Sequence, residues 1–398
     1  MTSRTPTTGS KSVLIPRSVA RAPPAYSRVM DAKFIDRTAA RRIGDPDGAS
    51  ASSTVSAPGR ICLAGENLDW MLPAGGPSVV AALDLRIHVT FSALSPPGDL
   101  VLRSNAPLYA RRRVRLEALD AYPGDVLDHL QAAAKVVADR TGVPRPGILD
   151  VHSRLPIGAG LSSSAALLLA AAGALLAAHG GRPDVRDVCA AAYAAECGEL
   201  ATGAGWMDFL ACAAGGVSRV VAAEAPTVER LAGGLDPAVI LVDTGRRPAI
   251  AQVMAGQRAR YDAGEPDAVR YAEETRDVAG QLAAALAERP VDHRAAGALV
   301  QRAQALLRDR LRCSTPLIDR CVERCLRAGA YCAKISGAGH GGFMFCLAPH
   351  PAVPAILAAL SPLPVRARPV PAVDRGLVFG DSPEYSVRVG CAAAWEQR

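Results

Sequence analysis

Pro156-Ile-Gly-Ala-Gly-Leu-Ser-Ser-Ser-Ala-Ala166 is the stretch of sequence that decides the fold. It lies between a predicted strand at Ile148–Ser153 and a predicted Ala- and Leu-rich helix that includes Ala165–Ala178. Its glycines let the backbone curl closely around an anion, and the N–H groups and dipole at the start of the helix attract phosphate. The stretch therefore predicts a phosphate-binding loop for a nucleoside triphosphate.

A plain N-capped helix after a flexible turn is the alternative explanation of this loop, because serine is a favoured cap. Capping accounts for one serine and one glycine, whereas the loop holds three serines, two glycines and a proline in this order. A Walker A loop is excluded because Gly-Lys-Ser/Thr is missing, and no Rossmann fingerprint fits. The three serine hydroxyls can bind phosphate oxygens or Mg²⁺.

A second polar cluster lies in Ala57-Pro-Gly-Arg-Ile-Cys-Leu-Ala-Gly-Glu-Asn-Leu-Asp-Trp70, at the end of a predicted strand. Arg60, Glu66, Asn67 and Asp69 place one cation, two carboxylates and an amide within ten residues. This combination suits several hydroxyls arranged on a ring. A solvated turn after a strand is the alternative.

Two glycine-rich stretches follow further along the chain. Ala195-Glu-Cys-Gly-Glu-Leu-Ala-Thr-Gly-Ala-Gly-Trp-Met-Asp-Phe209 contains Asp208, which taken alone could be a helix cap or a surface charge. Lys334-Ile-Ser-Gly-Ala-Gly-His-Gly-Gly-Phe-Met-Phe345 places four glycines between two predicted strands. Such a turn can bring backbone N–H groups to a transferred phosphoryl group or to the substrate, although a tight hairpin without a ligand is the alternative.

Together these stretches resemble the motifs of the GHMP kinases, the family of galactokinase, homoserine kinase, mevalonate kinase and phosphomevalonate kinase. The first motif is the stretch 57–70, the second is the phosphate loop at 156–166, and the third is the stretch 334–345. The motifs occur in the family's order, and the resemblance covers about residues 55–350. The resemblance implies ATP and Mg²⁺ as cofactors, with Ser164 and Glu196 as magnesium ligands and Glu199 as a nearby substitute for Glu196. The ATP-binding residues that it implies are Pro156, Gly158, Ala159, Gly160, Leu161, Ser162, Ser163 and Ser164.

The resemblance also implies roles at the acceptor hydroxyl. Asp208 matches the catalytic carboxylate, and Arg60 is the candidate partner that would keep this proton acceptor ionised. Glu66, Asn67 and Asp69 match acceptor-binding positions. From the third motif, Gly337 and Gly339 would approach the substrate.

Three departures separate this sequence from galactokinases. Asn67 stands where galactokinases have a histidine, and the stretch Asp69–Asp84 is longer than theirs. Val242-Asp-Thr-Gly-Arg-Arg247 resembles the strand that opens the galactokinase C-terminal domain, after which a sugar-contacting tyrosine follows; here that place reads Val253-Met-Ala-Gly256. We therefore expect a galactokinase-like kinase of a sugar or cyclitol other than galactose.

Other functions stay open at this point. One is a GHMP kinase of a hydroxy amino acid or of an isoprenoid alcohol, although Glu66 and Asp69 argue against an anionic acceptor by repulsion. Another is a non-catalytic galactokinase-like sensor. Such proteins tend to have a damaged phosphate loop, whereas residues 162–166 and Asp208 are intact here.

Predicted helices and predicted strands alternate along the sequence without a regular βαβ order, which predicts an α+β fold. The resemblance implies the GHMP kinase two-domain fold, with a ribosomal-protein-S5-like N-terminal domain, a ferredoxin-like C-terminal domain, and ATP and acceptor at their junction. Composition indicates a disordered basic arm at 1–53. We expect the N-terminal kinase domain with its ATP-binding loop at 54–235 and the C-terminal kinase domain at 236–398.

Local patterns predict the individual elements. The predicted strands before the phosphate loop are Arg60–Ala64, Ser78–Leu83, Arg86–Phe91, Arg112–Leu116 and Ile148–Ser153, and those after it are Gly216–Val221, Val239–Thr244, Ala330–Ser336 and Gly342–Leu347. The predicted helices besides the Ala/Leu helix are Val126–Arg140, Val185–Leu200, Val253–Ala263, Asp267–Glu288, His293–Leu311 and Thr315–Ala328.

The net charge of +7 over 398 residues is concentrated at the start of the chain. Residues 1–60 hold ten Lys and Arg against four Asp, so the remainder is nearly neutral and offers no nucleic-acid footprint. Ten scattered cysteines without a CxxC pair favour buried free thiols in a reducing cytoplasm. The longest apolar run, Ala165–Ala178, is too short for the roughly 20 residues that span a membrane. We expect a cytoplasmic enzyme whose partner is a small polyol, with no nucleic acid or membrane partner, and we leave its oligomeric state open.

Overall fold

The computed structural model describes residues 52–380 apart from 73–74, 107–108, 159, 224, 233 and 248. The expected basic arm lies outside these residues except for Ser52 and Ser53, which begin the first strand. Ala159 of the phosphate loop and residues 381–398 of the expected C-terminal domain also lie outside them. The described residues all belong to one compact unit.

The first sheet has the strand order β12-β1-β2-β5-β3-β4, with β6 bonded to β2 and β7 bonded to β6. Only the β3–β5 pair is parallel among the pairings of these described strands. The strands are β1 (Ser52–Ala64), β2 (Pro77–Ala93), β3 (Leu100–Ser104), β4 (Ala110–Val114), β5 (Gly147–Ser153), β6 (Val217–Val221), β7 (Thr227–Ala232) and β12 (Val378–Phe379).

Strand β2 is continuous, whereas the sequence predicted two strands with a break near Asp84. The first part of β2 pairs with β6 and the last part pairs with β5, while β1 runs along both parts. The long strand thus joins two neighbours that are far apart in the sequence. Strands β3, β7, β11 (Arg366–Pro369) and β12 were not predicted.

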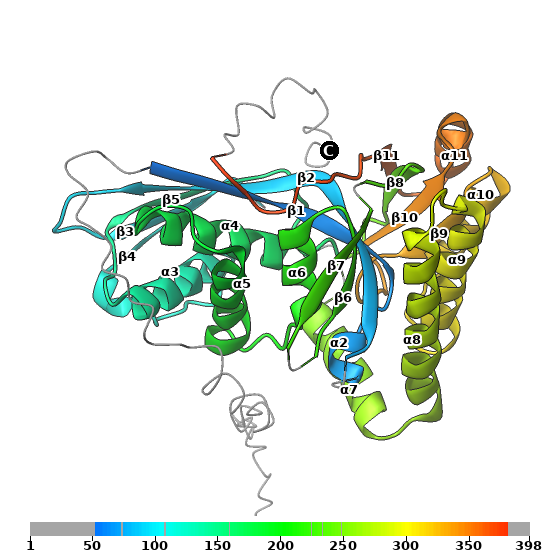
Figure 1. Cartoon of the computed structure of the whole chain (residues 1–398), viewed down its shortest axis with the longest axis horizontal. Coiled ribbons are helices and arrows are strands. Elements are labelled where there is room, and N and C mark those ends of the chain that lie inside the picture. Colours follow the sequence, from blue (N-terminus) through cyan, green and yellow to red (C-terminus); the bar gives the residue numbers. More distant parts are fainter. Residues whose placement is uncertain are drawn as a thin grey trace, which may run out of the picture. The chain divides into compact units, whose positions relative to one another are not determined.

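Four helices cover one face of this sheet (Figure 1). They are α3 (Asp128–Thr141), α4 (Ser163–Ala178), α5 (Val185–Tyr193) and α6 (Trp206–Ala214). Helix α4 packs against β1 and β2 on one side and against α3, α5 and α6 on the others. This explains why its sequence is apolar on every side, since a helix surrounded by other elements has no solvent face.

The second sheet is antiparallel, with the strand order β11-β8-β10-β9. Strands β8 (Ala238–Asp243), β9 (Cys332–Ile335) and β10 (Phe343–Ala348) complete it with β11. Helices lie between β8 and β9 and between β10 and β11 in the chain, which is the β-α-β-β-α-β order of a ferredoxin-like domain. The predicted α+β fold is confirmed, and the expected division between residues 235 and 236, which falls between β7 and β8, stays a prediction.

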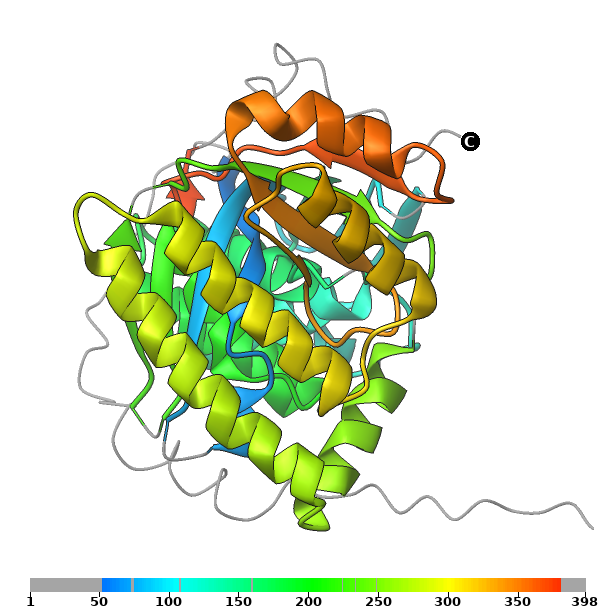
Figure 2. The same ribbon diagram turned by 90° about the vertical axis from the view of Figure 1, so that its right-hand side faces the viewer.

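The helices of this second part lie in front of its sheet in Figure 2. They are α8 (Pro266–Ala287), α9 (His293–Asp309), α10 (Pro316–Arg327) and α11 (Val353–Leu360), with α7 (Ile250–Asp262) preceding them in the chain. Glutamines of α9 cover the free edge of β9: Gln301 accepts the Ala333 N–H at 3.1 Å and Gln304 accepts the Ile335 N–H at 2.9 Å. Such side chains prevent an exposed strand edge from pairing with another chain.

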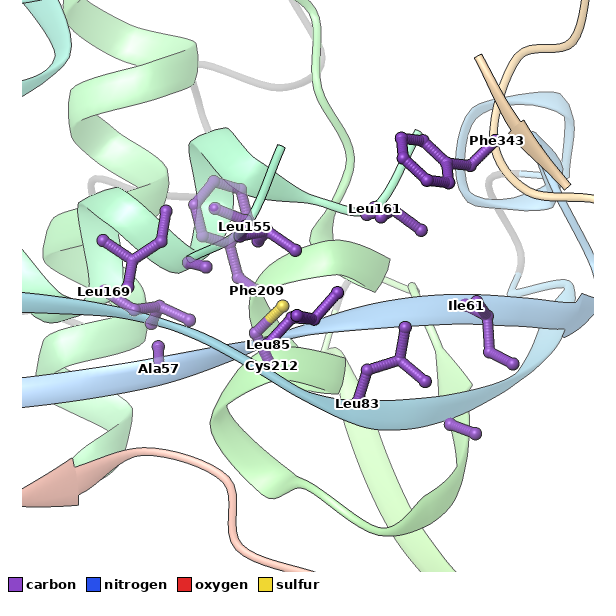
Figure 3. Packing of buried hydrophobic residues seen from close by; sticks show 14 of the residues in the cluster. Ala57, Ile61, Leu83, Leu85, Leu155, Leu161, Leu169, Phe209, Cys212 and Phe343 are labelled. Atoms are coloured by element: carbon purple, nitrogen blue, oxygen red, sulfur yellow. The ribbon is translucent and has the colours of Figure 1, made fainter. Parts of the chain in front are cut away.

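Buried hydrophobic residues from both sheets form one large cluster. In Figure 3, Leu155, Phe209 and Cys212 lie near the crossing of β1 and β2, and Leu161 and Phe343 belong to the same cluster. The nine described cysteines are all free, and eight of them are buried, as expected; Cys391 lies outside the described residues. Across residues 52–380, with the gaps named above, no helix is long and apolar enough to cross a membrane.

Candidate active site

A bulge in β1 directs Arg60 toward the phosphate loop. The register between β1 and β2 shifts between Pro58 and Arg60, at Gly59. A Cβ atom on Gly59 would lie 2.5 Å from the Leu155 side chain and 2.9 Å from the Leu161 carbonyl oxygen, so glycine is needed for this close approach. The Arg60 N–H donates to that carbonyl at 3.1 Å. Bulges of this kind re-aim side chains at functional sites.

The Arg60 guanidinium holds Asp208, which lies in the first turn of α6. Its Nε and Nη2 donate to Asp208 Oδ1 at 2.9 Å and 2.5 Å. Burial opposes the charge on Arg60, but the neighbouring Asp208 carboxylate outweighs this effect and the pKa of Arg60 is raised. The Arg60 side chain is 4% exposed and that of Asp208 is 29% exposed, so the carboxylate can reach a bound molecule. The structure thus brings together the predicted base and its predicted partner.

Aromatic packing fixes the start of α6. The rings of Tyr193 and Trp206 stack with centroids 4.0 Å apart, and Tyr193 also meets Phe209 edge to face at 5.7 Å. Tyr193 ends α5 and is followed by a π-helical segment, Ala194–Glu199. Single turns of π-helix are frequent at functional sites, because they change which side chains face inward.

The π-helical segment separates the two glutamates that the sequence left open as metal ligands. Glu196 is buried and accepts a hydrogen bond from Ser164, in the first turn of α4. The pKa of Glu196 is raised to about 7, because burial and the charge of Asp208 together outweigh the hydrogen bond from Ser164, which lowers it. Glu199 instead accepts a hydrogen bond from the Tyr122 hydroxyl at 2.9 Å. Ser164 and Glu196 therefore face each other, and Glu199 is engaged elsewhere.

The phosphate loop has groups that suit an anion. Ser162, the residue before α4, is in the left-handed region with φ 62°, and its side chain does not cap the helix. Its hydroxyl is buried and has no hydrogen-bond partner among the described residues. The Gly158 N–H donates to Ser163 Oγ at 3.3 Å, while Pro156 is half-buried and Leu161 is buried. An unpaired hydroxyl beside an uncapped helix N-terminus fits a bound triphosphate.

The third motif lies directly against this loop. Gly160 and Gly337 both have positive φ, and a Cβ atom on Gly337 would lie 2.8 Å from the Gly160 Cα atom. A Cβ atom on Gly160 would collide with the Ser336 carbonyl oxygen. The Gly160 carbonyl accepts from Arg60 Nη1 at 2.8 Å and from Ser336 Oγ at 2.9 Å. One carbonyl thus links the first, second and third motifs.

Glu66 was expected to bind the acceptor, and the structure places it in a buried ion pair. Its Oε1 atom pairs with Lys334 Nζ, which also donates to the carbonyl oxygens of Cys62 at 3.0 Å and Ile335 at 2.9 Å. The other carboxylate oxygen, Oε2, is buried and has no hydrogen-bond partner among the described residues. Sequence reasoning missed the role of Lys334, although a lysine inside an apolar strand was a signal that it must be paired.

Asp69 and Asn67 lie on the same turn of the first motif. Asp69 Oδ2 packs against Gly205, just before α6, at a place that a side chain on residue 205 would occupy. Asn67 is buried and donates from Nδ2 to Gln257 of α7 at 3.0 Å, a partner that sequence reasoning also missed. Gly339 of the third motif packs against Cys313.

Replacing Asp69 with asparagine should stabilise the protein at neutral pH. Burial and the charge of Asp208 raise the pKa of Asp69 from 3.8 to about 6, although Arg60 and nearby amides lower it. Because this pKa is higher in the folded state, ionisation opposes folding: stability falls as the pH rises from 4 to 6, and the full cost is present above 6. We expect a gain of roughly 1–3 kcal/mol at pH 7.5, at the lower end because solvent reaches Asp69.

Urea unfolding of the wild type and of Asp69→Asn at pH 7.5 and pH 3 measures this effect. The two proteins should have nearly equal stability at pH 3, where the carboxyl is largely protonated in both the folded and the unfolded state. An equal gain at both pH values would assign the effect to packing instead of charge.

The fold and the site together define a phosphotransferase that acts on an alcohol group. Two family models match the chain, "GHMP kinases N terminal domain" at residues 128–216 and "GHMP kinases C terminal" at residues 282–363. The chain is 30% identical to the galactokinase of Mycobacterium tuberculosis strain H37Ra, over 74% of this chain and 88% of that protein. This protein belongs to the GHMP kinase family, which uses ATP as the phosphate donor.

Other relatives cover the same region. The mevalonate kinase of Thermococcus sibiricus is 27% identical, over 74% of this chain and 88% of that protein. The crystal structure of Lactococcus lactis galactokinase complexed with galactose has a TM-score of 0.69 and 18% identity, and the match covers 82% of this chain and 95% of that chain. The likeness to this structure supports the two-domain GHMP fold.

Proposed function

We propose that this protein transfers the γ-phosphoryl group of ATP to a hydroxyl of a sugar or cyclitol other than galactose. The observation that carries the proposal is the contact of Arg60 with both Asp208 and the Gly160 carbonyl. One side chain thereby fixes the candidate base relative to the candidate phosphate loop. The 30% identity to a galactokinase supports the same assignment of activity.

In the proposed reaction, the acceptor hydroxyl lies between Asp208 and the γ-phosphate. Asp208 takes the hydroxyl proton as the oxygen attacks phosphorus, and the bond to the bridging oxygen of ADP breaks. Phosphoryl transfer needs mainly positioning and charge stabilisation, which the N–H groups at the start of α4 and the third-motif glycines can provide. The two hydrogen bonds from Arg60 hold the Asp208 carboxylate in place for this proton transfer.

Ser164 and Glu196 are the residues that we propose as magnesium ligands. Mg²⁺ would neutralise charge on the phosphates during transfer. No cluster of three or more His, Cys, Asp or Glu suited to a metal occurs among the described residues. This agrees with a magnesium site that takes few protein ligands and fills its other positions with phosphate oxygens and water.

Hydrogen-bond chemistry supports a polyol as the acceptor. The Asp69 carboxylate and the unpaired Oε2 atom of Glu66 are hydrogen-bond acceptors, so a ligand beside them has to bring O–H or N–H donors. Several neighbouring hydroxyls meet this need. Because Lys334 neutralises Glu66, repulsion by Glu66 disfavours an anionic acceptor less than the sequence suggested.

An ADP-release assay with a panel of neutral sugars, cyclitols, hydroxy amino acids and mevalonate tests this proposal. We expect the highest kcat/KM with a sugar or cyclitol and a lower value with galactose. Turnover with mevalonate alone would overturn the proposed acceptor class while keeping the kinase activity. ATP binding without turnover of any acceptor would favour the sensor alternative.

A further inference from the structure

Two of the departures from the galactokinase pattern lie on segments that meet in space, the turn at Asn67 and helix α7. Asn67 stands at the histidine position of the first motif, and residues 253–256 occupy the place of the sugar-contacting tyrosine. Gln257 follows that stretch directly, and α7 brings it to Asn67. Both side chains are buried, and Gln257 is only 4% exposed. A buried glutamine has to satisfy its amide, so its partners indicate its role.

The hydrogen bonds through these two amides run in a single direction. The indole Nε1 of Trp70 donates to Asn67 Oδ1 at 3.3 Å, Asn67 Nδ2 donates to Gln257 Oε1 at 3.0 Å, and Gln257 Nε2 donates to the Ala338 carbonyl at 3.2 Å. An indole N–H can only donate and a carbonyl can only accept. Both ends of the chain are therefore fixed, and each amide has one orientation that satisfies all the bonds.

This series of hydrogen bonds ends on the third-motif loop, at the Ala338 carbonyl. Ala338 lies between Gly337, which packs on the phosphate loop, and Gly339, which packs on Cys313. Gln257 Nε2 also donates to Cys313 Sγ at 3.0 Å, and the His340 N–H donates to the Cys313 carbonyl at 2.6 Å. Gln257 thus contacts both the loop itself, at Ala338, and Cys313, which packs against the loop.

We propose that Gln257 is a positioning residue that sets the spacing between the Asn67 turn and the third-motif loop, and that it thereby fixes the acceptor. The inference rests on the proposed function, because it assigns the acceptor to the space between these segments. Asn67 stands at the histidine position of galactokinases, and its partner Gln257 directly follows the stretch at the place of their tyrosine. This agrees with the proposed acceptor, a sugar or cyclitol other than galactose.

The first test compares Gln257→Met with Gln301→Met. Both variants remove a glutamine side chain that bonds to the backbone, but Gln257 bonds to Ala338 inside the third motif and Gln301 bonds to Ala333, just before it. We expect Gln257→Met to raise the KM for the best acceptor of the panel by about tenfold or more, while the KM for ATP changes less than about twofold. Gln301→Met should leave both values unchanged.

Two further experiments separate a directional series of hydrogen bonds from simple packing. Gln257→Glu keeps the size and still accepts from Asn67, but its carboxylate cannot donate to the Ala338 carbonyl, so we expect no rescue relative to Gln257→Met. The second experiment is a double-mutant cycle of Asn67→Ala, Gln257→Ala and the double variant. The loss of kcat/KM in the double variant should be close to the larger of the two single-variant losses. Additive losses, or normal acceptor KM in Gln257→Glu, would overturn the proposal.

A measurement made without any acceptor tests the positioning role of Gln257 independently of the proposed function. Hydrogen exchange of the amides of residues 336–342 should be faster in Gln257→Met than in the wild type and unchanged in Gln301→Met. If the panel shows turnover only with a hydroxy amino acid or mevalonate, the acceptor class is wrong and the kinetic comparison is made with that compound. Unchanged loop exchange together with unchanged acceptor KM would show that Gln257 has no positioning role.

Discussion

Asp208→Asn should abolish ATP-dependent phosphorylation and leave nucleotide binding intact. The asparagine oxygen can still accept the hydrogen bonds of Arg60, so the local geometry is kept. The amide cannot accept the proton of the acceptor hydroxyl, and removing such a base costs roughly 10²–10⁴-fold in rate. An ADP-release assay measures turnover, and titration with a fluorescent ATP analogue measures binding.

A matched control for this variant is Asp125→Asn. Asp125 is also paired with an arginine, Arg112, but outside the proposed site. This control should keep nearly full turnover, and both variants should melt close to the wild-type temperature. Near-normal turnover of Asp208→Asn would remove Asp208 from the role of base, whereas loss of nucleotide binding would show that the substitution disturbs the phosphate loop.

The sequence predicts most of the elements that carry the motifs, because each has a strong local pattern. The helix after the phosphate loop is apolar over its whole length, and the buried strands β8 and β10 are apolar runs. The break expected near Asp84 is absent because this part of β2 keeps partners that are distant in the sequence: Ala82 and Arg86 pair with β1, and the Asp84 N–H donates to the Pro371 carbonyl at 2.8 Å. Strand β12 has two residues and exists through its pairing with β1, which no local pattern reports.

In the site, too, residues within sequence motifs could be predicted, whereas a residue placed by contacts between distant segments could not. Arg60, Asp208, Ser164 and Glu196 lie in motifs whose family resemblance places them, and the structure brings them together. Gln257 lies 190 residues from Asn67, in a helix whose surrounding residues are mostly exposed. Its burial depends on how α7 meets the first motif, so neither propensity nor periodicity could identify it.

Removing Lys334 should destabilise the protein more than any other single substitution considered in the site. Lys334 is fully buried and its partner Glu66 is nearly so, and together they join the second sheet to the end of β1. A buried ion pair adds little net stability, but breaking one by removing a single partner costs about 3–5 kcal/mol, because a charge is left buried without compensation. We expect Lys334→Met to lose this amount in urea unfolding, with an unchanged m-value.

The double variant Lys334→Met/Glu66→Gln tests whether the unpaired charge is the cause. It removes both charges and should regain most of the lost stability, because no ion is then buried alone. Lys135→Met is the surface control: Lys135 pairs with Asp139 one helical turn away, and such pairs contribute little. If the double variant is as unstable as Lys334→Met, the hydrogen bonds of Lys334 to the Cys62 and Ile335 carbonyls matter more than its charge. Recovery of stability without recovery of turnover would instead assign Glu66 a second role, in which its unpaired oxygen binds the acceptor.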